Sequence, residues 1–144
     1  MGLISNGTTI FDAGSMSAGG SMTFIKKLTA SSSGTLSFVD GASSVVLDDT
    51  YKEYLFTFKD IHAQTDNVFF QFNLSTDGGS NYNVTKTSTV FGSYHNENGN
   101  STDLSYRSGD NGGLAQSTAF QNITTPDNMS SDNDHILSGT FTIF

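Results

Sequence analysis

The sequence contains no cysteine and no tryptophan, and only one of its 144 residues is proline. The absence of cysteine excludes disulfide scaffolds and cysteine–zinc sites. Charged residues make up 14% of the chain, whereas an average globular domain contains about 25%. Only six residues are Lys or Arg, against 14 Asp or Glu, so the formal net charge is −8. We therefore expect no nucleic-acid partner, because binding to phosphates requires a basic face.

Basic residues are scarcest in the second part of the chain. Residues 1–86 hold five Lys against eight acids, whereas residues 87–144 hold Arg107 alone against six acids. This part is expected to be repelled by nucleic acids and anionic membrane surfaces. No apolar run approaches the roughly 20 residues of a membrane helix. The first thirty residues also lack the apolar run of a signal peptide. We therefore expect no membrane partner and a chain that is made in a cytoplasm and stays soluble.

Small polar and aromatic residues take the place of the missing charges. Ser, Thr and Asn account for 51 residues, and the chain has 12 Phe and 5 Tyr. This aromatic content argues against disorder. Val, Ile, Thr, Tyr and Phe, the residues that favour strands, total 48, and no window shows helical periodicity. The sequence therefore predicts an all-β protein.

Alternation of apolar and polar residues locates the expected strands. Tyr54, Phe56 and Phe58 are separated by single residues, so they should share one face of a strand. Turns rich in Gly, Ser and Asn lie between the alternating segments, as in sandwiches and partly closed barrels. The expected strands are 22–30, 35–38, 54–58, 68–74, 84–94 and 139–144.

The chain is predicted to have two parts. Residues 22–144 should form a single antiparallel β-sandwich of jelly-roll-like type. Residues 1–21 hold five glycines, which weaken an independent strand. We interpret them as an extended N-terminal arm that becomes ordered by docking on a neighbouring subunit, a terminus without fixed order being the alternative. Its expected docking anchors are the apolar residues Leu3, Ile4, Ile10 and Phe11.

Motifs for catalysis or cofactor binding are missing. The chain has no Gly-x-Ser-x-Gly elbow, no nucleotide-binding glycine motif and no paired histidines. Glu97 and Asp103 as a glycosidic carboxylate pair, and residues 127–134 as a calcium-binding loop, are the weaker alternatives. We therefore expect no enzymatic activity, no metal and no cofactor.

Residues 75–82 (STDGGSNY) carry a local structural motif. They resemble the Asp-box hairpin, in which an aspartate caps backbone amides of the turn and an aromatic residue packs beneath it. Asn81 and Tyr82 replace the usual Thr and Trp. The motif implies a structural role rather than a catalytic one, carried by Ser75, Asp77, Gly79 and Tyr82.

Exposed tyrosines offer a second function, because a tyrosine joins an apolar ring to a polar tip and can stack on a sugar. A glycan site would need one or two such rings beside carboxylate or amide groups in loops at one end of the domain. The residues that fit this description are Tyr94, Glu97, Tyr106 and Asp110. The loops around them are rich in glycine, and ordering them would cost about 1–2 kcal/mol per residue, so any affinity is expected to be weak.

A series of short segments recurs in a recognisable order along the chain. The segments are 6–12 (NGTTIFD), 22–33 (MTFIKKLTASSS), 36–41 (LSFVDG), 51–58 (YKEYLFTF), 61–62 (IH), 75–82, 114–120 (LAQSTAF) and 138–141 (SGTF). In this order they resemble β-rich virion proteins of marine tailed bacteriophages, of the cyanophage and pelagiphage kind. The resemblance implies an appendage, fibre or decoration subunit of the virion, assembled in the host cytoplasm and bound to other virion proteins; it supplies no catalytic residue. We expect a homotrimer.

Overall fold

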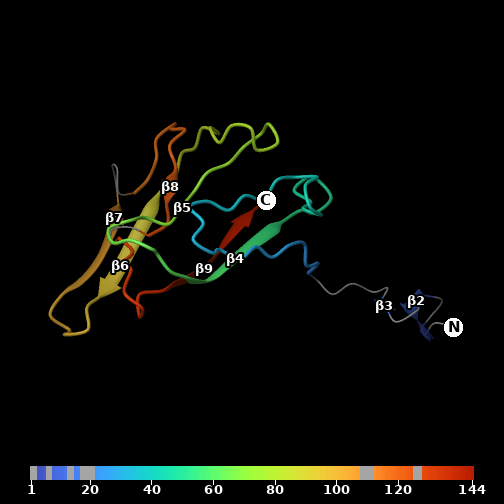
Figure 1. Ribbon diagram of the computed structural model, residues 1–144, viewed down its shortest axis with the longest axis horizontal. Helices are drawn as coiled ribbons and strands as arrows, with labels where there is room; N and C mark the ends of the chain where they lie inside the picture. Colours follow the sequence, from blue (N-terminus) through green and yellow to red (C-terminus); the bar gives the residue numbers. More distant parts are fainter. Residues whose placement is uncertain (1–2, 6–7, 13–14, 17–21, 108–111, 125–127) are drawn as a thin grey trace.

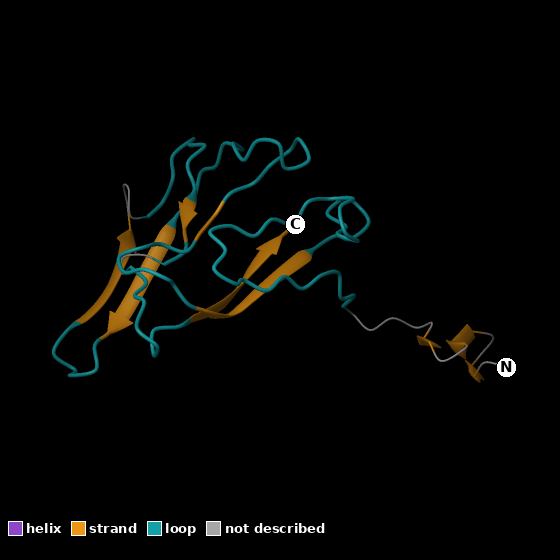
Figure 2. Cartoon of the chain, viewed as in Figure 1, coloured by secondary structure: helices purple, strands orange, loops and turns teal. Residues whose placement is uncertain are grey.

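The computed structural model describes residues 3–5, 8–12, 15–16, 22–107, 112–124 and 128–144. Throughout these ranges the chain consists of strands, turns and loops, without a helix (Figure 2). All strand pairs are antiparallel. The all-β class predicted from the sequence is confirmed. The strands are β1 (Leu3–Ser5), β2 (Thr8–Asp12), β3 (Ser15–Met16), β4 (Tyr54–Ile61), β5 (Gln71–Phe72), β6 (Val90–His95), β7 (Thr102–Arg107), β8 (Gln121–Asn122) and β9 (Leu137–Ile143).

Strands β4 and β9, the two longest of the described strands, pair with each other (Figure 1). Tyr54, Phe56 and Phe58 are half-buried along one face of β4, while the residues between them are exposed, as the alternation predicted. Phe141 of β9 lies opposite Phe56, and their ring centroids are 6.0 Å apart. The face that carries these rings is the apolar side of the sheet.

Aromatic side chains from other segments cover this face. The Phe72 ring of β5 lies 4.4 Å from the Phe141 ring, and the Phe38 ring lies 5.4 Å from that of Phe56. Phe70 and Phe58 are in similar contact, with ring centroids 5.0 Å apart. Offset and edge-on contacts at these distances are favourable beyond the area they bury. We refer to Phe38, Phe56, Phe58, Phe70, Phe72 and Phe141 as the aromatic layer.

Few side chains are removed from solvent completely. Among the residues that can be described, the buried apolar ones are Val45 and Met129, and no side chain is less than 2% exposed. Several large apolar side chains in the described ranges are mostly exposed, among them Phe24 at 80%, Phe91 at 72% and Leu104 at 77%.

Several predicted strands are shorter in the structure or do not form. Of the predicted strand 84–94 only Val90–His95 is a strand, because the preceding residues bond to a loop instead of to a strand. There Lys86 N donates to Ser117 O at 2.8 Å and Ser88 N donates to Leu114 O at 2.9 Å. The predicted strands at 22–30 and 35–38 are irregular. Pairing across distant segments, which alternation does not encode, decides these outcomes.

Strands β1, β2 and β3 form a small sheet of their own in the order β1-β2-β3. Leu3 of β1 lies opposite Phe11 of β2, and Phe11 in turn lies opposite Met16 of β3. No strand pair among the described residues joins this sheet to β4–β9 or to any later strand (Figure 1). The predicted anchors Leu3, Ile4, Ile10 and Phe11 thus lie in β1 and β2, and the role of residues 1–21 as a docking arm stays a prediction.

Candidate functional site

The β6–β7 hairpin combines several of the candidate residues on one element. Its six paired positions run from Val90↔Arg107 to His95↔Thr102. Because side chains alternate between the two faces of a strand, this register assigns each pair to one face. The inner face carries Val90, Gly92, Tyr94, Asp103, Ser105 and Arg107, and the outer face carries Phe91, Ser93, His95, Thr102, Leu104 and Tyr106.

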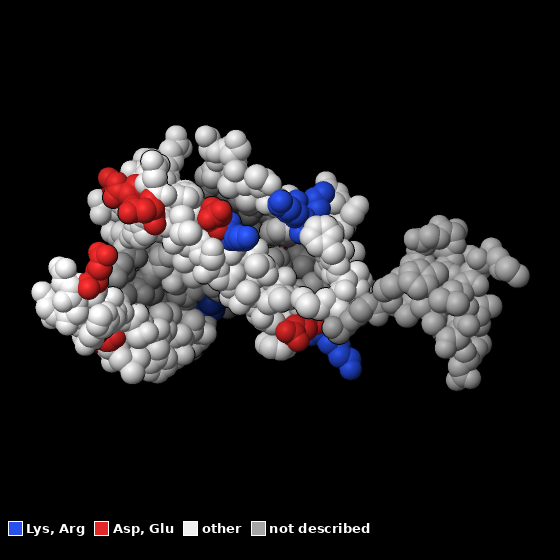
Figure 3. Space-filling model, turned by 90° about the horizontal axis from the view of Figure 1, so that it is seen from below, with Lys and Arg blue, Asp and Glu red and all other residues white. Residues whose placement is uncertain are grey.

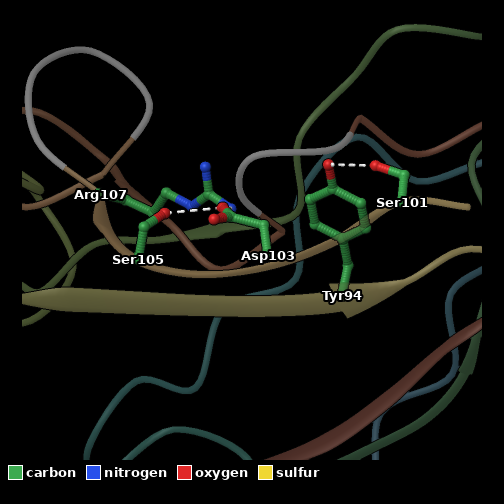
Figure 4. Close-up of polar contacts among 5 residues, drawn as sticks. All are labelled: Tyr94, Ser101, Asp103, Ser105 and Arg107. Carbon is green, nitrogen blue, oxygen red and sulfur yellow. Dashed lines mark hydrogen bonds and ion pairs between the residues drawn. The ribbon is translucent and has the colours of Figure 1, made fainter.

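The inner face of the hairpin is polar. Arg107 Nη2 lies 2.6 Å from Asp103 Oδ2, and the side chains of the two residues are 18% and 35% exposed. The Ser105 hydroxyl donates to the same carboxylate oxygen at 2.7 Å. Figure 4 shows these three side chains on one side of the hairpin together with Tyr94 and Ser101. Gly92 is buried beneath Arg107, since a Cβ atom at position 92 would lie 2.8 Å from Arg107 Nε.

The layer below the hairpin is also polar. Gln121 and Asn122 of β8 are 5% and 8% exposed. Gln121 Nε2 donates to Gly112 O at 3.0 Å, and the Ser88 hydroxyl donates to Gln121 Oε1. Gln71 Nε2 of β5 donates to Asn122 Oδ1 at 2.5 Å. This side of the molecule is thus held together by hydrogen bonds rather than by apolar packing.

The outer face of the hairpin is apolar and open to solvent. Phe91 is 72% exposed, Leu104 77% and Tyr106 51%. The Phe91 and Tyr106 rings are in edge-on contact, with centroids 5.6 Å apart. The hairpin therefore presents its large apolar side chains to solvent and its ion pair to the rest of the chain. An antiparallel sheet with one solvent-exposed face usually buries its apolar side chains and exposes its polar ones.

The four predicted glycan contacts are not brought together. Tyr94 is on the inner face, 40% exposed, with its hydroxyl 3.1 Å from Ser101 Oγ. Tyr106 is on the outer face, so the two rings point to opposite sides of the hairpin. Glu97 is exposed in the turn between β6 and β7. Asp110 lies outside the described residues. The described arrangement contains no two-tyrosine platform at this hairpin.

The turn at residues 75–82 has the hydrogen bonds that the sequence motif implies. Asp77 Oδ1 accepts from Asn81 N at 2.8 Å, and the Ser75 hydroxyl oxygen accepts from Gly79 N at 3.0 Å. Hydrogen bonds from the Ser75 hydroxyl and from Asn81 lower the pKa of Asp77 to about 2. Gly79 has a φ of 81°, which explains a glycine there. Tyr82 is half-buried, with its hydroxyl near Gly79.

The acidic residues in the described part of the chain do not form a metal site. Within the described ranges no group of three or more His, Asp or Glu side chains has the geometry to hold a metal ion. In the loop considered for calcium, Ser131 is held by Asp66, whose Oδ1 accepts from Ser131 N at 2.7 Å. The hydrogen bonds from Ser131 and Ser130 lower the pKa of the Asp66 carboxyl.

Basic side chains are unevenly distributed along the molecule. In Figure 3 most Lys and Arg side chains lie over the middle and toward the end away from the β6–β7 hairpin, whereas carboxylates lie at the hairpin end, in the middle and toward the other end. This distribution follows the sequence, in which residues 87–144 contain a single Lys or Arg. A partner at the hairpin end therefore meets either carboxylates or the uncharged outer face.

Sequence reasoning missed that Phe91 and Leu104 are exposed. The signal was present as the alternation of Leu104 and Tyr106 with Asp103 and Ser105, but a strand with this pattern is normally expected to bury its apolar side. The alternation identifies two faces without saying which one the rest of the chain covers. Only the burial of Gly92, Ser105 and Arg107 shows that the polar face is the more covered one.

Comparison of the chain with family models, with curated proteins and with solved structures found no match. In the part of the chain that the structure describes, no helix is long and apolar enough to cross a membrane.

Proposed function

We propose that the chain is a structural subunit of a bacteriophage virion, as an appendage, fibre or decoration protein, and that it acts through protein–protein contacts rather than by catalysis. The observation that carries the proposal is the exposed apolar face of the β6–β7 hairpin, with Phe91 72% and Leu104 77% exposed. Exposed apolar patches on a polar molecule mark sites of association. The resemblance of its sequence segments to virion proteins of marine tailed phages is the reason for proposing a phage particle as the assembly.

The finer architecture is part of the same proposal. The described strands form sheets of two or three members, and three or more strands on an apolar face are usually needed for independent stability. We infer that a complete jelly-roll-like sandwich exists in the assembled homotrimer, bound to other virion proteins after assembly in the host cytoplasm. The apolar residues of β1 and β2 are the proposed contacts of the docking arm.

Labelling of phage particles tests this function. Particles of a phage that encodes the chain are purified, and a gold-labelled antibody against the chain is imaged on them by electron microscopy. We expect labels at regular positions, and mass spectrometry of the same particles should detect the chain in a fixed ratio to the major capsid protein. Particles without the chain would contradict the proposal. Antibody on particles of a deletion mutant is the control for unspecific labelling.

A carbohydrate-binding module is the second candidate. Tyr94 supports it, because its ring is 40% exposed on the same face as Asp103 and near the turn that contains Glu97. A glycan array probed with the purified oligomer tests it. We expect no binding at sub-millimolar affinity, since a single tyrosine offers little stacking area. A reproducible signal would support receptor binding as the function if Tyr94→Ala abolishes it and Tyr106→Ala, on the opposite face, does not.

A further inference from the structure

We propose that the outer face of the β6–β7 hairpin is the surface on which copies of this chain associate, so that each copy covers this face of another. The inference rests on the proposed structural function and names the partner of its apolar surface. The face consists of Phe91, Ser93, His95, Thr102, Leu104 and Tyr106.

The side chains of the outer face fit the centre of an interface. Phe91 is 72% exposed, Leu104 77% and Tyr106 51%. Phe91, Leu104 and Tyr106 are the right kind of residues for the centre of such an interface, because large aromatic and aliphatic side chains supply most of its energy when they are desolvated.

The charge pattern favours a second copy over a foreign partner. A chain with a net charge of −8 attracts foreign proteins most readily through basic surfaces that face its carboxylates. The outer face offers no carboxylate, since Asp103 is on the inner face in its ion pair with Arg107. Two acidic copies, in contrast, meet the least repulsion where neither surface carries a carboxylate. The outer face meets this condition, with Ser93 and Thr102 as its neutral polar members.

The shape of the hairpin also suits association with itself. Stacked sheets pack about 10 Å apart with interdigitating side chains, and this face alternates large and small residues across its register. Phe91 lies opposite Tyr106, whereas Ser93 lies opposite Leu104. A large pair on one copy can therefore fill the space above the small serine of another. Packing of this kind covers the outer face, whose Phe91 and Leu104 are exposed in a single chain.

Cysteine cross-linking tests the contact directly, because the natural chain contains no cysteine. Ser93→Cys places a thiol at the centre of the outer face, and Ser105→Cys places one on the inner face as the matched control. Under mild oxidation with copper phenanthroline we expect Ser93→Cys to give a covalent pair of chains that is at least tenfold more abundant than with Ser105→Cys. Equal yields from both variants at micromolar concentration would overturn the proposal.

A charge on the outer face provides the second measurement. Leu104→Asp should weaken self-association more than tenfold and shift the mass in light scattering toward that of one chain. Phe24→Asp is the control, since Phe24 is 80% exposed but lies outside the hairpin, and it should leave the mass unchanged. Circular dichroism checks that both variants keep their strands. A natural chain that is monomeric at micromolar concentration, or a Leu104→Asp variant with unchanged mass, contradicts the proposal.

The outcomes separate this inference from the function on which it rests. If the chain forms cross-linked pairs but is absent from phage particles, the proposed interface is supported and the proposed virion function is contradicted. If particles are labelled but the chain is monomeric and does not cross-link, the interface is contradicted and the virion function is supported. A mass of two chains instead of three supports the contact and contradicts the expected trimer.

Discussion

Two antiparallel ladders in this protein use the same alternation with opposite results. In β4–β9 the aromatic side is covered by Phe38, Phe70 and Phe72, and the polar side faces solvent. In β6–β7 the ion-paired side faces the rest of the chain, and the aromatic side faces solvent. An amphipathic strand therefore does not by itself determine which of its faces is buried. The segments that pack against each ladder determine it.

The largest expected effect concerns the covered ladder. Phe141 contacts both Phe56 and Phe72 in the aromatic layer. We expect Phe141→Ala to lower the free energy of unfolding by about 3 kcal/mol, near the lower end for truncation of a buried phenylalanine because Phe141 is only half-buried. Urea denaturation measures the change. All variants are compared at one protein concentration, because the stability of an oligomer depends on it.

Phe144→Ala is the matched control for this prediction, since Phe144 is 92% exposed and follows β9 directly. Its free energy of unfolding should stay within about 0.5 kcal/mol of the natural chain. Equal losses from the two variants would mean that the aromatic layer does not hold the sheet together.

A pair of glycines sharpens the contrast between the ladders. A Cβ atom at Gly139 of β9 would lie 2.7 Å from Phe58 Cε2, whereas one at Gly92 of β6 would lie 2.8 Å from Arg107 Nε. The Phe58 ring is held in the aromatic layer, while the Arg107 side chain is flexible. We expect Gly139→Ala to destabilise by about 1–2 kcal/mol through overpacking and Gly92→Ala to have a smaller effect. Thermal unfolding of both variants measures the difference, and the reverse order would refute it.

The ion pair of the inner face should contribute less to the free energy of unfolding than the aromatic layer does. Arg107 and Asp103 are 18% and 35% exposed, and Arg107 Nε is buried without a hydrogen-bond partner in the described structure. We therefore expect Arg107→Ala to cost only about 1 kcal/mol, much of it from lost packing of the aliphatic part over Gly92. Urea titrations at low and high salt measure it. A loss as large as that from Phe141→Ala would make the polar face the main source of stability.

The smallest effect concerns the turn at residues 75–82. Because the folded pKa of Asp77 is about 2, below its ordinary value of 3.8, the turn's contribution to stability is fully present above about pH 4. It is lost as the pH falls through about 2. Carbon NMR of the Asp77 carboxyl should show a midpoint near pH 2. Ser75→Ala removes the largest cause of the shift and should raise the midpoint; an unchanged midpoint contradicts this assignment.

Local signals predicted some features well. The alternation of Tyr54, Phe56 and Phe58 identified β4 and its covered face, and residues 75–82 predicted their own turn. Both depend on neighbours in sequence. The sequence did not predict that residues 84–89 bond to a loop, that the predicted strand 22–30 is irregular, or that the hairpin is inverted. These features depend on which distant segment, or which other copy, meets each face.

The pairing of β4 with β9 has a consequence for synthesis on the ribosome. Asp60 N of β4 donates to Ser138 Oγ of β9 across 78 positions of the chain. The intervening segment has to be made before the ladder can close, and bringing such distant strands together is slow. During translation the aromatic side of β4 therefore stays exposed until β9 has been made, while β6 and β7, which are close to each other in sequence, can already pair. Strand β9 completes the sheet, so a nascent chain stalled before residue 137 should be sensitive to protease and prone to aggregate.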